Sequence, residues 1–282
     1  MSALDARPAE RYEKPSRLLY LSEATRATSE FWLAAATAPV VATLPKGDGH
    51  TVLVLPGFGG SNSSTLVLRG VLAAIGYEAK GWRGGRNLGP SLAVVDSLTR
   101  TVTSHVRRSG GKISIIGWSL GGIYARLLAQ RMPDDIRSII TLGTPFRATS
   151  LDDTHAGSTY KLMGLLKRNN PNSLHYPTGY RGPVPVPSTS IFSKTDGIVP
   201  WRSCIDERDS GHENVEVFGS HCGLGHHPGA LMVIADRLSQ PSGAWKHFEP
   251  SGAARALTRT WSTSAPTRRC HGGSADQVAA RA

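Results

Sequence analysis

The chain has 282 residues, of which 39% are hydrophobic. A chain of this length can form one domain with a full core. Its net charge of +11 would suit an acidic partner, but no nucleic-acid-binding motif accompanies the charge, so we expect no nucleic acid among the partners. An odd number of cysteines excludes a fully paired disulfide framework, and we expect reduced, buried thiols, although Cys204 and Cys222 could pair.

Residues 1–44 are predicted to form an N-terminal helical segment that packs on the core. A helix over residues 16–38 should face the sheet with its apolar side chains, which are Leu18, Leu19, Leu21, Phe31, Trp32 and Leu33. The apolar run from Phe31 to Leu44 is too short to span a bilayer and contains Pro39. The first residues mix acidic and basic charges without an early apolar segment, so we expect no signal peptide and a cytoplasmic location.

A strand is predicted at Thr51–Leu55, and a glycine-rich loop, Pro56–Ser61, follows it. The loop lacks the Lys-Ser/Thr ending of a phosphate-binding loop, which argues against a nucleotide site. Glycines allow the backbone to approach a substrate closely and leave an N–H pointing inward. We therefore assign the backbone N–H of Phe58 as one donor of an oxyanion hole.

The most informative segment is Gly117–Gly122, with the sequence Gly-Trp-Ser-Leu-Gly-Gly. A β-branched strand at Lys112–Ile116 precedes it, and an amphipathic helix over Ile123–Gln130 follows it. A strand that turns directly into a helix around a Gly-x-Ser-x-Gly sequence is typical of a nucleophile elbow. The pattern predicts Ser119 as an exposed nucleophile.

Two features of this elbow support acyl chemistry. Gly117 and Gly121 remove the side chains that would collide at such a turn. The N-terminus of the following helix offers backbone N–H groups to a developing oxyanion, and we assign Leu120 as the second donor. Trp118 could help to wall an acyl pocket or could serve only in packing.

A serine nucleophile needs a base and an orienting acid. In chains with a nucleophile elbow of this kind, the acid follows the serine along the sequence and the histidine follows the acid. Asp196 lies just past a predicted strand at Ser188–Ser193, and His221 follows the alternating strand Asn214–Phe218. A helix is predicted from Gly229 to Leu238. We therefore predict a Ser-His-Asp triad of Ser119, His221 and Asp196.

Other acids and histidines stay open for these roles. The alternative acids are Asp206, Glu207 and Asp209, and the alternative histidines are His212, His226 and His227. No set of cysteine, histidine and carboxylate residues shows the spacing of a metal site, so we expect neither a metal nor a cofactor.

Residues 146–187 are predicted to form a cap over the site, because they are too many for a simple crossover. An amphipathic helix within this segment could present apolar side chains to an acyl chain or could close the core; they are Leu162, Met163, Leu165 and Leu166. Residues 251–282 are rich in small polar residues and arginine, and we expect a disordered basic tail.

With these pieces in order, the chain resembles the α/β-hydrolase superfamily and, within it, the bacterial serine esterases and lipases. The motifs that carry the resemblance are Pro56–Gly60, Gly117–Gly122, Gly143–Phe146, Thr195–Pro200 and Gly219–His221. The resemblance implies an α/β-hydrolase fold over residues 45–250, with a mostly parallel central sheet, helices on both faces and a cap insertion. One departure is Pro56-Gly57, where many lipases carry His-Gly, and this weakens any inference about triglyceride specificity.

The sequence thus predicts a cofactor-independent carboxylic-ester hydrolase, an esterase or lipase that works through an acyl-serine intermediate. Its partner would be a small-molecule or lipid ester, with transient contact to a lipid interface, and its oligomeric state is open. A thioesterase, amidase or acyltransferase would use the same triad. A hydrolase-like binding protein without activity is the remaining alternative.

Overall fold

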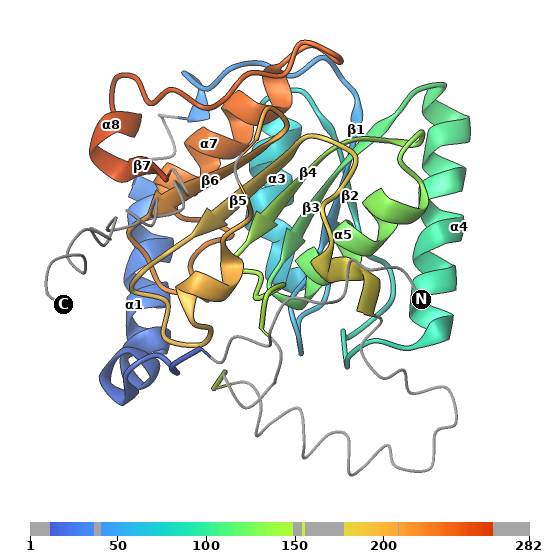
Figure 1. The fold of residues 1–282 in the computed structure, drawn as a ribbon. Coiled ribbons are helices and arrows are strands. Elements are labelled where there is room, and N and C mark those ends of the chain that lie inside the picture. The colour runs from blue at the N-terminus through green and yellow to red at the C-terminus, as the bar shows by residue number, and fades with distance from the viewer. Residues whose placement is uncertain (1–11, 37–40, 149–153, 156–177, 208, 262–282) are drawn as a thin grey trace, which may run out of the picture.

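The computed structural model describes residues 12–36, 41–148, 154–155, 178–207 and 209–261. Within these ranges the core is a seven-stranded sheet in the order β2-β1-β3-β4-β5-β6-β7 (Figure 1). Neighbouring strands run parallel except for β7, which is antiparallel to β6. The strands are β1 (Thr51–Leu55), β2 (Glu78–Gly81), β3 (Ile113–Trp118), β4 (Ile136–Leu142), β5 (Ser188–Phe192), β6 (His212–Val217) and β7 (Thr258–Trp261).

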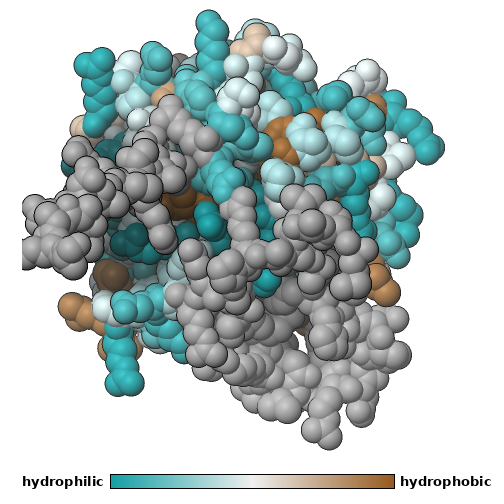
Figure 2. All heavy atoms as spheres, viewed as in Figure 1, coloured by the Kyte–Doolittle hydropathy of each residue, from teal (hydrophilic) through white to brown (hydrophobic). Residues whose placement is uncertain are grey.

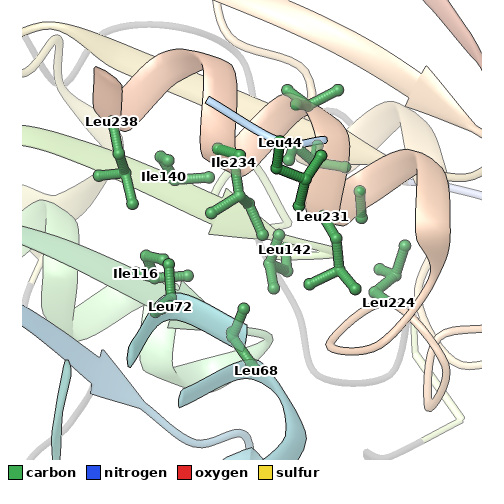
Figure 3. Close-up of a cluster of buried hydrophobic side chains, with 14 of the residues drawn as sticks. Leu44, Leu68, Leu72, Ile116, Ile140, Leu142, Leu224, Leu231, Ile234 and Leu238 are labelled. Carbon is green, nitrogen blue, oxygen red and sulfur yellow. The ribbon is translucent and has the colours of Figure 1, made fainter. Parts of the chain in front are cut away.

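Helices cover both faces of the sheet, so the predicted α/β fold is confirmed. On one face lie α3 (Leu66–Ala74) and α7 (Pro228–Ser239), and Figure 3 shows their leucines and isoleucines packed over Ile116 and Ile140. On the other face lie α4 (Leu92–Ser109) and α5 (Leu120–Arg131). Strand β1 serves both layers because its side chains alternate between them: its valines enter the first cluster and its leucines the second.

Parallel pairing brings the carboxyl ends of three strands together. Leu55 at the end of β1 pairs with Gly117, and Trp118 at the end of β3 pairs with Leu142. The segments that leave these strands therefore emerge at one edge of the sheet, where open α/β sheets place their ligands.

The predicted strand at Asn214–Phe218 needs a correction. Strand β6 begins at His212 and ends at Val217, and all six of its residues are buried, including Glu213 and Glu216. The alternation had indicated a half-buried strand, but β6 pairs with β5 and β7 and carries helix α7 on one face. Its carboxylates are paired instead of solvated: Glu213 with Arg237, and Glu216 with Lys194.

Helix α1 (Arg17–Ala36) forms as predicted, but its orientation contradicts the expectation. Five of the six apolar side chains expected to face the sheet are exposed, among them Leu18 at 78%, Leu21 at 76% and Trp32 at 67%, whereas Leu19 is half-buried. Figure 2 shows hydrophobic side chains at the lower left, where Figure 1 places this helix. The one buried residue of α1 is Glu23, so the helix docks through polar groups.

The expected disordered tail at 251–282 is also wrong for its first part. Residues 254–257 form α8 (Ala254–Leu257), and β7 extends the sheet beyond β6. Trp261 stabilises this strand by packing edge-on against Trp201 and Phe192, with ring centroids 5.5 and 6.1 Å apart. Residues 262–282, and with them Cys270, lie outside the described part.

Two further expectations concern the thiols and the membrane. Cys204 and Cys222 do not pair; Cys204 is buried, whereas Cys222 lies at the surface and so departs from the expected burial. Over the residues that the structure describes, no helix combines the length and apolar character needed to cross a bilayer.

Candidate active site

Ser119 lies at the turn from β3 into α5 with a strained backbone, at φ 53° and ψ −119°. A non-glycine residue with a positive φ is costly and persists only where its surroundings hold it. Three hydrogen bonds do so here. The Ser119 N–H donates to the carbonyl of Leu142 at 2.7 Å, and the Ser119 carbonyl accepts from Gly122 N at 3.0 Å and from Thr144 Oγ1 at 2.9 Å.

The two glycines of the predicted elbow are required by close backbone contacts. A Cβ at Gly117 would collide with the carbonyl of Gly121 and the backbone of Gly122, and a Cβ at Gly121 would collide with the carbonyl of Leu55. Strand β1, strand β3 and the first turn of α5 therefore meet at backbone distance beneath Ser119. This explains why the elbow needs glycine at both positions.

Asp196 and His221 form a buried pair at the same edge. Asp196 lies in the turn after β5 and His221 in the turn after β6, and their side chains are 1% and 8% exposed. His221 Nδ1 lies 2.6 Å from Asp196 Oδ2, while the N–H groups of Ile198 and Val199 each donate to Asp196 Oδ1 at 2.8 Å. One carboxylate oxygen is thus fixed by the backbone and the other is directed at the imidazole.

The protonation of His221 follows from these neighbours. Burial disfavours the imidazolium and lowers the pKa of His221, but the Asp196 carboxylate, by its charge and its hydrogen bond, and the charge of Glu23 outweigh burial. The net result is a pKa raised above the ordinary value of 6.5. The site therefore stabilises a positive charge on the histidine.

Most of the alternative acids and histidines have other partners. Asp206 pairs with Arg126 at 2.5 Å, and Asp209 pairs with His212 at 2.7 Å. The ring of His226 reaches the carbonyl of Ala27 at 3.1 Å. Glu207 also has an interaction partner and is exposed, and His227 is buried, which lowers its pKa.

The elbow and the histidine loop are connected through Trp118. Its indole Nε1 donates to the carbonyl of His221 at 3.1 Å, and a Cβ on Gly225 would lie 2.7 Å from the ring. The ring also packs against the cluster beneath α3 and α7. The structure shows Trp118 packed on the core and bonded to the histidine loop, and its role in an acyl pocket stays a prediction.

The described part of the structure shows Ser119 and His221 without a direct hydrogen bond. Between the described side chains of Ser119 and His221, the structure contains no hydrogen bond from Oγ to Nε2. Gly143, which follows β4, fills the space beside the pair: a Cβ there would lie 3.0 Å from His221 Nδ1 and 3.2 Å from Asp196 Oδ2. The structure thus brings His221 and Asp196 together at the carboxyl edge, and the contact between Ser119 and His221 stays a prediction.

The backbone segments that carry the two predicted oxyanion donors lie beside Ser119. Leu120 opens α5, where backbone N–H groups have no acceptor within the helix. The loop that carries Phe58 passes close to the elbow, since a Cβ on Gly57 would lie 3.1 Å from Ser119 Cβ. Both backbone segments therefore border the space in front of Ser119.

A residue that the sequence did not reveal, Asn87, fixes the glycine-rich loop. Its side-chain Nδ2 donates to the carbonyl of Pro56 at 2.8 Å, and its backbone exchanges two hydrogen bonds of 2.7 Å with Gly59 and Gly60. Tyr124 from α5 donates to Asn87 Oδ1 at 3.3 Å. Because Asn87 is fully buried, it fixes the glycine-rich loop that contains Phe58 from the protein interior.

Four residues of the predicted cap are predicted to bind substrate. Leu162, Met163, Leu165 and Leu166 lie outside the described residues, as does most of the segment 146–187.

A second Ser-His-Asp arrangement occupies the opposite edge of the sheet. His50 Nε2 lies 2.9 Å from Ser114 Oγ, and His50 Nδ1 lies 2.5 Å from Asp48 Oδ1. Ser114 is 1% exposed within β3, and no helix begins after it. Burial lowers the pKa of His50, Asp48 opposes this, and the Arg137 cation adds to the lowering. We interpret this cluster as structural, because its serine cannot meet a substrate.

Comparisons with known proteins agree with this geometry at the level of the fold. Residues 77–198 match the family described as "PGAP1-like alpha/beta domain". The matched part contains Ser119 and Asp196 and ends before His221. A search among curated proteins finds no match.

Solved structures with similar shape include three hydrolases. Aspergillus fumigatus lipase B is 17% identical with a TM-score of 0.49, over 72% of this chain and 56% of the lipase. A pyrethroid hydrolase from Sphingobium faniae JZ-2 is 20% identical with a TM-score of 0.47, over 68% and 98% of the two chains. A monoacylglycerol lipase from Paleococcus ferrophilus is 14% identical with a TM-score of 0.44, over 68% and 96%. The match thus spans little more than half of the fungal lipase, and similarities at this level assign no activity to this chain.

The family match falls on the central strands and on the elbow, and the structure supplies the remaining evidence independently. The sheet has six parallel strands among its seven described ones, helices cover both faces, and a strained serine links β3 to α5. The chain has an α/β-hydrolase fold, and its residues 77–198 match the PGAP1-like alpha/beta domain family.

Proposed function

We propose that the protein is a serine carboxylic-ester hydrolase, an esterase or lipase that uses Ser119 as nucleophile, His221 as general base and Asp196 as the orienting acid. The observation that carries the proposal is the buried pair of His221 and Asp196, 2.6 Å apart, at the sheet edge where the elbow presents Ser119. A carboxylate that holds Nδ1 leaves Nε2 as the acceptor for the serine proton.

In the first half of the reaction, Ser119 Oγ attacks the ester carbonyl carbon while His221 Nε2 takes the serine proton. The carbonyl oxygen becomes an oxyanion that the N–H groups of Leu120 and Phe58 would stabilise. The tetrahedral intermediate then collapses. Its bond to the alcohol oxygen breaks, and the leaving alcohol receives the proton from His221.

In the second half, water attacks the acyl-serine and gives a proton to His221. The second tetrahedral intermediate releases the carboxylic acid, and Ser119 regains its proton from the histidine. Asp196 stays ionised throughout and stabilises the imidazolium, which agrees with the raised pKa of His221.

The test is the initial rate of hydrolysis of p-nitrophenyl esters from acetate to palmitate. Ser119→Ala removes the proposed nucleophile, and Ser114→Ala is the matched control, because Ser114 is the serine of the second, buried Ser-His-Asp arrangement. We expect hydrolysis by the wild-type protein and by Ser114→Ala, and no hydrolysis above background by Ser119→Ala. The optimum chain length would distinguish an esterase from a lipase.

An inactive wild-type protein across the whole ester series would reject ester hydrolysis. In that case thioester, amide and acyl-acceptor substrates test the thioesterase, amidase and acyltransferase alternatives, which use the same acyl-serine. Hydrolysis that persists in Ser119→Ala would reject the proposed nucleophile.

A further inference from the structure

Helix α1 contacts the candidate active site through the carboxylate of Glu23, whereas the sequence predicts an apolar contact for this helix. Glu23 is 4% exposed, and its Oε1 accepts from Gly197 N at 2.6 Å and from His221 N at 3.1 Å. Its Oε2 accepts from Cys222 N at 3.2 Å. One side chain from α1 therefore joins the turn that carries Asp196 to the turn that carries His221.

The turn after β5 is shaped to receive this helix. A Cβ at Gly197 would collide with the carbonyl of Leu19, so the glycine permits backbone contact between the turn and the first turns of α1. Arg26, also on α1, donates to the carbonyl of Thr195 at 2.9 Å and to Glu23 at 2.9 Å. The Asp196 turn is thus bound to α1 through both a carbonyl and an N–H.

A carboxylate is an expensive group with which to make a purely structural contact. Burying an ionised group costs free energy, which Glu23 recovers through three backbone donors and Arg26. What the charge adds is a negative neighbour for His221. After burial and Asp196, Glu23 is the next contributor to the pKa of His221, and it acts in the raising direction.

We propose that Glu23 is a positioning residue of the active site: it sets the Asp196 turn against the His221 turn and places a second negative charge beside the imidazolium. This inference rests on the proposed function, because it assigns Glu23 a part in the same proton transfer. Glu23 acts through the two turns that it joins and has no part in bond making or breaking in this proposal.

The same helix supplies a matched control. Glu30 accepts from the N–H and the Oγ of Ser220, both at 2.7 Å, and so binds the His221 turn one residue away from the histidine. It makes no hydrogen bond to the Asp196 turn. Removing the charge of Glu30 weakens a contact of similar strength to that of Glu23. It leaves the connection between the Asp196 turn and the His221 turn in place.

The charged and titratable groups near His221 come from three elements. Asp196 faces it from the turn after β5, Glu23 from α1, and the Cys222 thiol lies next to it in its own turn. Arg26 and Glu30 approach from α1, with Arg26 paired to Glu23. A change in the charge at position 23 should therefore be visible in the titration of His221.

The experiment compares wild type, Glu23→Gln and Glu30→Gln by thermal unfolding, by kcat and KM for the preferred p-nitrophenyl ester, and by the pH dependence of kcat/KM. In Glu23→Gln we expect kcat to fall by about ten- to a hundred-fold with a smaller change in KM. The acidic limb of kcat/KM should move to lower pH, because the imidazolium loses a negative neighbour. Glu30→Gln should lose similar stability and keep the acidic limb in place.

An unmoved acidic limb in Glu23→Gln, or equal shifts in both variants, overturns the inference while the proposed function stands. A wild-type protein without ester hydrolysis overturns the proposed function itself. If Glu23→Gln does not fold, Glu23→Asp decides, because it keeps the charge and draws the carboxylate back from the two turns. Its kcat should fall more than that of Glu30→Asp, and equal kcat values overturn the inference.

Discussion

The indole of Trp118 donates a hydrogen bond to the carbonyl of His221 at 3.1 Å, so the residue before the elbow serine anchors the backbone of the proposed base. The indole of Trp118 is therefore a spacer: it fixes the distance between the turn that carries His221 and the elbow that carries Ser119. Aromatic packing of Trp118 on the core beneath α7 makes this spacer rigid.

Trp118→Phe should distinguish the contribution of the Trp118 hydrogen bond from that of its packing on the core. Phenylalanine keeps most of the apolar contact but removes the donor, so we expect a loss of about 1 kcal/mol in the free energy of unfolding and a fall in kcat. Trp82→Phe is the matched control, because Trp82 Nε1 also donates to a backbone carbonyl, that of Gly85, at 2.9 Å. Denaturant unfolding and kcat measure the two effects, and equal kcat values for both variants would contradict the account.

Asn87→Ala should weaken the glycine-rich loop beside Phe58. Without Nδ2 the carbonyl of Pro56 loses its buried donor, and the backbone that would hold the oxyanion becomes less ordered. We expect kcat to fall by about ten- to a hundred-fold, with KM less affected. Tyr124→Phe removes only one hydrogen bond to the same side chain and should have a smaller effect. The prediction fails if Asn87→Ala keeps the kcat of the wild type.

The pH dependence of kcat/KM should report the raised pKa of His221. A general base must be neutral, so activity falls as pH drops through that pKa, and the acidic limb should lie above the ordinary histidine value of 6.5. Asp196→Asn removes the largest raising influence, so its residual activity should show an acidic limb at lower pH and a kcat lower by about 10⁴-fold. A wild-type limb below 6.5 would contradict the electrostatics of the buried pair.

Cys222, next to the histidine, should be a poor nucleophile. Although Cys222 reaches the surface, partial desolvation of its thiol and the nearby carboxylates of Glu23 and Asp196 raise the pKa of Cys222 to about 11. At pH near 7.5 the thiolate is scarce, so alkylation by iodoacetamide should be a few hundred-fold slower than for free cysteine. Peptide mass spectrometry separates Cys222 from the other thiols, and alkylation at the rate of free cysteine would refute the raised pKa.

The sequence was most informative where local backbone geometry decides the structure. Gly117 and Gly121 are needed by contacts within one strand-turn-helix unit and with the adjacent β1, so the elbow could be predicted from one short segment. Asp196 and His221 were found because each follows a strand end, and the structure brings their side chains together.

Contacts between distant segments could not be predicted in this way. Glu23 is 174 residues from Gly197 and 198 from His221 along the chain. The apolar residues of its helix predict the opposite orientation, but most of them are exposed in the structure. Strand β7 was missed because its stability comes from pairing with β6 and from Trp201, not from its own composition. Asn87 carried no local signal, since its partner Pro56 is 31 residues away.

The most direct test of the central claim is mass spectrometry after reaction of the wild-type protein with a fluorophosphonate probe. The account predicts one adduct, mapped by peptide analysis to Ser119, with reaction in Ser114→Ala and none in Ser119→Ala. An unlabelled wild-type protein, or an adduct on a serine other than Ser119, would contradict it.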